Sequence, residues 1–79
     1  MRIFIYLYAS YASYLPRGST GNSCTREVAD GVLVSQVLKD MGIPLDTPKI
    51  IFVNGRHASD DTILKSGDRL AVFPPIAGG

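Results

Sequence analysis

The residues best suited to chemistry stand at the end of the sequence, which closes with Phe73, Pro74, Pro75, Ile76, Ala77, Gly78 and Gly79. Prolines donate no backbone hydrogen bond and favour an extended chain, so the Pro-Pro pair predicts a stiff stalk. Glycines carry no Cβ, so the last two residues can thread a narrow channel. We therefore expect an enzyme to act on the Gly79 carboxylate, with Gly78, Ala77, Pro75 and Pro74 as the threading segment. The alternative is an ordinary flexible terminus, because a Gly-Gly end by itself is a weak signal.

No catalytic set accompanies this terminus. His57 is the only histidine, and no nucleophile can be paired with it, so we interpret it as a solvated loop residue. Cys24 is the only cysteine, and we interpret it as a small buried hydrophobe; a persulfide carrier is the alternative. The sequence has no CxxC motif and no Cys/His cluster to hold zinc. We expect no catalytic residue, no metal and no bound cofactor.

Length and composition predict one small folded domain. The 79 residues are too few for two cores, and 46% hydrophobic content with four Tyr and three Phe suffices for one. Eight Lys and Arg against seven Asp and Glu leave a net charge of +1 without a basic stripe. Nucleic acid is therefore not an expected partner.

The first residues loosely imitate a secretory signal, with Arg2 before an apolar stretch over residues 3–9. Tyrosines interrupt that stretch, and its removal would take away the first strand. No segment approaches the roughly 20 apolar residues of a membrane span, so we expect no membrane partner. A single cysteine forms no internal disulfide, which suits a reducing compartment, and we expect a cytoplasmic protein.

The first half of the chain contains two predicted strands and a helix. Residues 2–8 form an unbroken β-branched, aromatic and leucine run, which predicts a central strand. After a polar loop, residues 24–29 predict a second strand related to it by a hairpin. One helical face is then indicated by Val34, Val37, Leu38 and Met41. Gly42 and Pro44 end this helix.

The second half contains three more strands. Residues 50–53 predict a strand, and Asn54-Gly55 is a strong hairpin signal because both turn residues need positive φ. A short return strand should pass through His57. Residues 60–65 favour one helical turn capped by Asp60 or Asp61, and residues 69–73 form the last strand. The order predicts an α+β fold with a mixed four- to five-stranded sheet and one main helix packed on one face.

Alternation along the strands divides the sheet into two faces. The face under the helix is expected to hold Ile3, Ile5, Leu7, Val53, Leu70 and Val72. The opposite face keeps Phe4, Tyr6, Tyr8 and Phe73. Scattered surface aromatics are common, whereas a contiguous apolar area on a small protein marks a partner site. We predict that Phe73, Tyr8, Tyr6 and His57 dock partners.

Five segments of the sequence match a known family: Tyr14-Leu15-Pro16, Met41-Gly42-Ile43-Pro44, Val53-Asn54-Gly55, Gly67-Asp68 and the terminus from Phe73-Pro74-Pro75 to Gly78-Gly79. Through these segments the sequence resembles the MoaD and ThiS sulfur carriers over nearly its whole length. The Phe-Pro-Pro form and the length are more similar to MoaD, the small subunit of molybdopterin synthase. The resemblance implies a ubiquitin-like β-grasp domain over residues 1–73, with parallel first and last strands, and an extended tail over residues 74–79. His57 is a departure, since the family often has an apolar side chain there.

The resemblance also implies the chemistry of the tail. An adenylating enzyme of the ubiquitin-activating type, similar to MoeB or ThiF, would join the Gly79 carboxylate to AMP from ATP. Sulfur from a persulfide donor would displace AMP and leave a thiocarboxylate. In the MoaD branch, the tail enters a larger catalytic subunit similar to MoaE, which supplies the catalytic groups and builds the dithiolene of molybdopterin.

Two other functions stay open. The same activated Gly79 would serve thiamin or tRNA thiolation, or attachment to lysines of other proteins as a ubiquitin-like modifier. A different class is a noncatalytic interaction module that binds through its aromatic face. That module predicts that loss of Gly79 is harmless.

Overall fold

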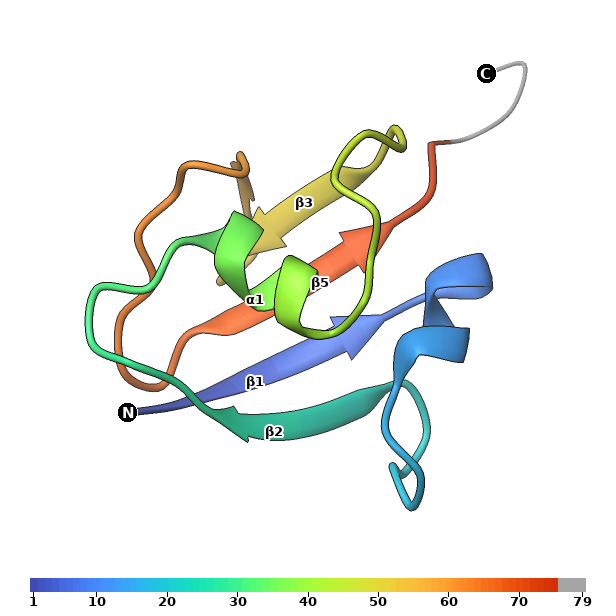
Figure 1. Cartoon of the computed structure of the whole chain (residues 1–79), viewed down its shortest axis with the longest axis horizontal. Coiled ribbons are helices and arrows are strands. Elements are labelled where there is room, and N and C mark those ends of the chain that lie inside the picture. Colours follow the sequence, from blue (N-terminus) through green and yellow to red (C-terminus); the bar gives the residue numbers. More distant parts are fainter. Residues whose placement is uncertain (76–79) are drawn as a thin grey trace.

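A computed structural model describes residues 1–75 of the chain. Its five strands form one mixed sheet in the order β2-β1-β5-β3-β4 (Figure 1). The strands are β1 (Arg2–Leu7), β2 (Ser23–Glu27), β3 (Ile50–Val53), β4 (Arg56–Ala58) and β5 (Arg69–Phe73). The first and last strands, β1 and β5, are parallel neighbours, and the other pairs are antiparallel. The helix α1 (Val34–Asp40) lies over one face of this sheet. The predicted α+β class and the predicted order of the five strands and the main helix are confirmed.

The core lies between α1 and the sheet face predicted for it. The side chains of Ile3, Ile5, Leu7, Leu70 and Val72 are fully buried there, and Val53 packs partly buried against them. From the helix, Val34, Val37 and Leu38 close this core. Burial of each such aliphatic side chain contributes about 1.5–3 kcal/mol. No polar or charged residue is buried within residues 1–75, so the core between the helix and the sheet is a single apolar layer.

The helix is short, and both of its ends are held by specific contacts. At the start, the Gln36 side chain accepts a hydrogen bond from the Leu33 amide (2.9 Å). The amides of Val34 and Ser35 donate to the carbonyls of Thr62 (3.0 Å) and Asp60 (2.9 Å). These contacts satisfy N–H groups that have no partner inside a helix. At the end, Gly42 has φ +85°, the left-handed conformation predicted for the residue that stops the helix.

The helical turn predicted over residues 60–65 is wrong. The segment makes a turn at residues 60–61, and Ile63 then forms an isolated β-bridge with Leu33. Its carbonyls are used by the first turn of α1, and Leu64 is buried, so tertiary contacts replace the local helix that Asp60 or Asp61 would have capped. Thr62 Oγ1 instead accepts a hydrogen bond from the Ser59 amide (3.0 Å).

A 3₁₀ helix, η1 (Ala9–Tyr14), follows β1 and was not predicted. Its anchor is Tyr11, which is buried and whose hydroxyl donates to the Pro48 carbonyl (3.0 Å). The contact joins η1 to the loop that precedes β3. A tyrosine buried through a partner distant in the sequence gives no local signal, because its position depends on a loop formed elsewhere.

The hairpin between β3 and β4 forms as predicted, with φ +54° at Asn54 and +80° at Gly55. The Asn54 side chain also fixes the start of β5. Its Nδ2 donates to Asp68 Oδ1 (2.8 Å), and its Oδ1 accepts from the Arg69 amide (2.9 Å). Asp68 Oδ2 accepts from the Lys65 amide (2.8 Å). This asparagine therefore links the β3–β4 turn to the turn before β5.

Candidate functional site

The base of the C-terminal stalk lies at the end of β5. That strand stops at Phe73 as predicted; Pro74 is half-buried and Pro75 is exposed. Since β5 lies between β1 and β3, the stalk leaves from the middle strand of the sheet (Figure 1). The predicted roles of Ala77, Gly78 and Gly79 fall outside the described residues, and the boundary between domain and tail stays a prediction.

Aromatic side chains gather on the sheet face opposite α1. We call this surface the aromatic face and define it as Phe4, Tyr6, Tyr8, Phe52 and Phe73. The rings of Tyr8 and Phe73 stack with centroids 4.5 Å apart and an interplanar angle of 2°. Parallel pairing of β1 with β5 creates this stack, and the Tyr8 amide extends the pairing by donating to the Val72 carbonyl (3.1 Å). Stacking holds both rings beside the base of the stalk.

Phe52 also belongs to the aromatic face, although it was not among the residues predicted for it. Its ring lies edge-on to Phe73, with centroids 5.9 Å apart at 90°, and against His57, with centroids 4.7 Å apart. Alternation in β3 could have identified it, because Ile51 and Val53 face the core and Phe52 must point the other way. His57 is exposed, and it joins the aromatic face through Phe52 alone. The structure thus brings the four predicted docking residues to one face, while docking itself stays a prediction.

A hollow of about 390 Å³ lies in the aromatic face and opens to solvent. It is lined by Tyr6, Tyr8, Phe52, Gly55, Arg69, Ala71 and Phe73. The small side chain of Ala71 lies between Tyr6 and Phe52, which are its partners on the two neighbouring strands. Missing volume at Ala71 therefore produces the hollow, and larger rings surround it.

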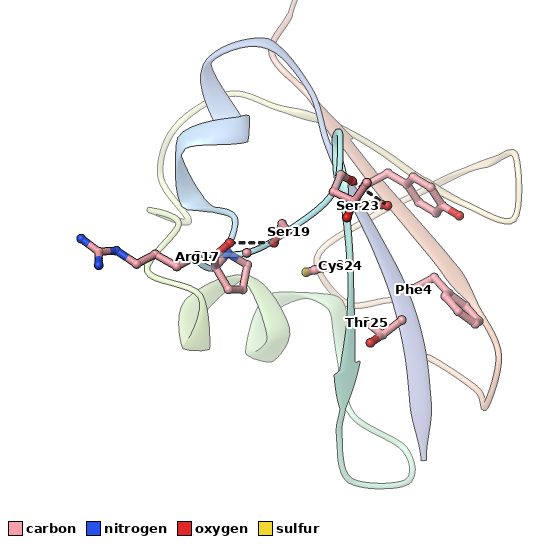
Figure 2. Close-up of a pocket in the computed structure, with 10 residues that line it drawn as sticks. Phe4, Arg17, Ser19, Ser23, Cys24 and Thr25 are labelled. Atoms are coloured by element: carbon pink, nitrogen blue, oxygen red, sulfur yellow. Dashed lines mark hydrogen bonds between the residues drawn. The ribbon is translucent and has the colours of Figure 1, made fainter.

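A second groove lies along the outer strand β2, beside the loop of residues 16–20 (Figure 2). Its lining combines the polar side chains of Arg17, Ser19, Ser23 and Thr25 with the rings of Phe4 and Tyr6. Cys24 on β2 points away from the sheet face that carries Phe4, toward the loop of residues 16–20 (Figure 2). Its side chain is half-buried and packs against the core. Burial raises the pKa of the Cys24 thiol, and the nearby Arg26 lowers it to a smaller degree. This supports the interpretation of Cys24 as a packing residue.

We expect Cys24 to react slowly with iodoacetamide. The thiolate is the reactive form, and a raised pKa leaves less thiolate at any given pH. Alkylation followed by mass spectrometry at pH 8 should be slower for the folded protein than for the urea-unfolded chain, and faster as the pH rises. Equal rates in the two states would contradict the assignment of Cys24 as a packing residue, and a faster reaction of the folded protein would favour a persulfide role.

Neither a metal site nor a membrane span appears among residues 1–75. No group of three His, Cys, Asp or Glu side chains comes together there. The described helices are too short and too polar to cross a bilayer. The aromatic face and the stalk that starts beside it are the features that call for a functional explanation.

The ThiS family model matches residues 16–79, most of the chain. The chain belongs to the ThiS family. This family comprises small ubiquitin-like proteins that act as sulfur carriers or modifiers, and the match includes β5 and the terminal Gly-Gly. The resemblance to ThiS and MoaD inferred from the sequence is confirmed. A search among curated proteins finds no match.

Solved structures confirm the ubiquitin-like β-grasp fold of this ThiS-family chain. SAMP1 from Haloferax volcanii has a TM-score of 0.74 at 22% identity, with complete coverage of both chains. A putative molybdopterin converting factor subunit 1 from Pyrococcus furiosus has a TM-score of 0.72 at 24% identity, covering 95% of this chain and 98% of that one. The HVO 2177 protein of Haloferax volcanii has a TM-score of 0.77 at 25% identity, covering 100% of this chain and 87% of that one.

Proposed function

We propose that this chain is a cytoplasmic sulfur carrier that delivers sulfur for molybdopterin synthesis as the small subunit of a molybdopterin synthase. The observation that carries the proposal is the aromatic face at the base of the Phe-Pro-Pro stalk, in a ThiS-family chain that ends in Gly-Gly. The aromatic face docks the partner, and the stalk carries the Gly79 carboxylate into the partner's active site.

The chemistry proceeds on the Gly79 carboxylate. An adenylating enzyme of the MoeB or ThiF type joins this carboxylate to the AMP part of ATP, and pyrophosphate leaves. The terminal sulfur of a persulfide donor then attacks the acyl carbon, and AMP departs. A thiol cleaves the resulting S–S bond, so that a disulfide forms and the thiocarboxylate remains on Gly79. A larger MoaE-like subunit takes up the tail, and the thiocarboxylate sulfur forms a bond to the pterin substrate. Water then cleaves the bond between this sulfur and the acyl carbon, which regenerates the Gly79 carboxylate. The chain itself acts as carrier and co-substrate.

A second candidate is a ubiquitin-like protein modifier. SAMP1 supports it, because that protein is described as a small archaeal modifier protein and its fold covers the present chain completely with a TM-score of 0.74. A lysine amine would attack the same acyl adenylate, release AMP and form an isopeptide bond to Gly79. The two functions therefore share the first step and differ in the nucleophile.

Mass spectrometry of the protein purified from its own host tests the proposal. Sulfur in place of one oxygen adds about 16 Da, and oxidation of Met or Cys adds nearly the same mass. Trypsin cleavage after Arg69 resolves the two, because residues 70–79 contain neither Met nor Cys. We expect the gain on this fragment in cells that make the molybdenum cofactor. Isopeptide adducts of Gly79 on lysines would favour the modifier, and an unchanged fragment with no adducts would refute both functions.

A further inference from the structure

The hollow in the aromatic face has an apolar end and a basic end. Tyr8 and Phe73 line the end beside the stalk, and Arg69 lies at the other end of β5 together with Gly55. Its open form suits a side chain projecting from a flat protein surface better than a small molecule, since small-molecule sites enclose most of their ligand. An aromatic pocket at the centre of a docking face is where binding energy concentrates in protein interfaces.

The backbone at Arg69 is fixed by the hairpin turn. The Arg69 amide donates to Asn54 Oδ1 (2.9 Å), and the Arg69 carbonyl accepts from the Asn54 amide (2.9 Å). On the other side, Arg69 is the register partner of Phe4 in β1. A guanidinium carried by such a fixed strand loses less conformational entropy on binding than one on a mobile loop.

Asp68, the residue next to Arg69 in the sequence, and Glu27 on β2 both have other partners. Asp68 accepts hydrogen bonds from Asn54 Nδ2 and the Lys65 amide, each 2.8 Å long. Glu27 of the outer strand β2 pairs with Arg2 of β1 at 3.0 Å. Within residues 1–75, Arg69 forms no salt bridge, and no carboxylate lines the hollow. The hollow therefore presents a guanidinium that has no carboxylate partner among the described residues, beside apolar rings.

We propose that the hollow receives a large apolar side chain of the adenylating enzyme, and that Arg69 binds a carboxylate adjacent to that side chain. The proposal rests on the proposed function and adds the chemistry of the complementary surface. Ala71 gives the apolar side chain room, and the guanidinium offers planar paired donors that match a carboxylate. The complementary surface of the partner therefore has a protruding apolar side chain with an Asp or Glu carboxylate next to it.

The test is the affinity of the full-length chain for the host's adenylating enzyme, measured by calorimetry at several salt concentrations. Arg69→Gln should weaken binding about tenfold and flatten the salt dependence, as expected for loss of a charge-assisted contact. Arg17→Gln, in the loop beside β2, is the matched control and should bind like the wild type. Ala71→Leu should also weaken binding about tenfold by filling the hollow, whereas Thr25→Leu adds a similar side chain on the same sheet face outside the hollow and should not.

Comparison with Phe73→Ala separates this inference from the function it rests on. If Phe73→Ala weakens binding while Arg69→Gln and Ala71→Leu do not, the inference is wrong and the docking face stands. If none of these variants changes the affinity, the docking role of the aromatic face fails as well. The alternative occupant of the hollow is a second copy of this chain, and sedimentation of the free wild type and variants tests it. A wild-type dimer that Ala71→Leu disrupts would overturn the assignment of the hollow to the adenylating enzyme. Thermal melts of each variant confirm that the domain is folded.

Discussion

Deletion of Gly79 should abolish adenylation and leave the melting temperature of the domain unchanged. The buried core of residues 1–75 extends from Ile3 to Val72, and β5 ends at Phe73, so we expect the domain to fold without the last residue. The shortened chain ends roughly 3.3 Å earlier, the length of one extended residue. A misplacement of that size at a reacting group costs on the order of 100-fold or more in rate. ATP–pyrophosphate exchange with the host's adenylating enzyme measures this loss.

Gly78→Val is the companion variant, because it keeps the length of the tail and the terminal carboxylate. A β-branched side chain restricts the backbone and widens the segment, so adenylation should fall if the tail passes through a narrow channel. Normal adenylation of the chain lacking Gly79 would defeat the sulfur-carrier assignment and favour the interaction module, for which the terminal residue is dispensable.

Phe73→Ala should weaken binding to the adenylating enzyme or the larger catalytic subunit by roughly 30-fold or more. Truncation of a central aromatic anchor costs about 2 kcal/mol or more, and about 1.4 kcal/mol corresponds to a factor of ten. The melting temperature should fall modestly, because the Phe73 ring is half-buried and stacks on Tyr8 outside the buried core. Calorimetric titration and thermal melts measure the two quantities separately.

Phe4→Ala is the matched control for Phe73. It removes a ring from the same sheet face, with 37% of the residue exposed, but at the end of β1 away from the stalk. Its effect on binding should be clearly smaller. Should Phe73→Ala unfold the domain, or bind as the wild type does, the docking surface lies elsewhere on the protein.

The strands were predictable wherever local chemistry decides their ends. Asn54-Gly55 permits the positive φ values of the turn, so β3 and the return strand followed from the sequence, and β5 was predicted with its observed bounds. Strand β2 was expected over residues 24–29 and spans Ser23–Glu27, since its polar alternation gives a weaker signal. The error over residues 60–65 and the missed η1 share one cause: both segments are held by partners distant in the sequence.

The sequence predicted which aromatic residues of β1 and β5 share the candidate site, but it did not predict the hollow between them. Alternation along β1 and β5 placed Tyr6, Tyr8 and Phe73 on the face away from the helix, and the structure confirms this placement. The hollow required the register of β1, β5 and β3, because Ala71 is conspicuous only between Tyr6 and Phe52. In the sequence, Arg69 is one of several scattered basic residues, and Asp68 beside it could be its partner. The structure shows instead that Asp68 accepts hydrogen bonds from the Asn54 side chain and the Lys65 amide.

The position of β5 between β1 and β3 governs when the aromatic face exists during synthesis. Without β5, the pairs β1–β2 and β3–β4 have no common strand, so a nascent chain cannot close the sheet until its final strand has emerged. Tyr8 and Phe73 come from opposite ends of the chain and meet only in that finished sheet. A misfolded or incomplete copy therefore lacks the assembled surface, even where its sequence includes the same terminal glycines. Under the function proposed above, this topology would restrict adenylation of Gly79 to protein that has already folded.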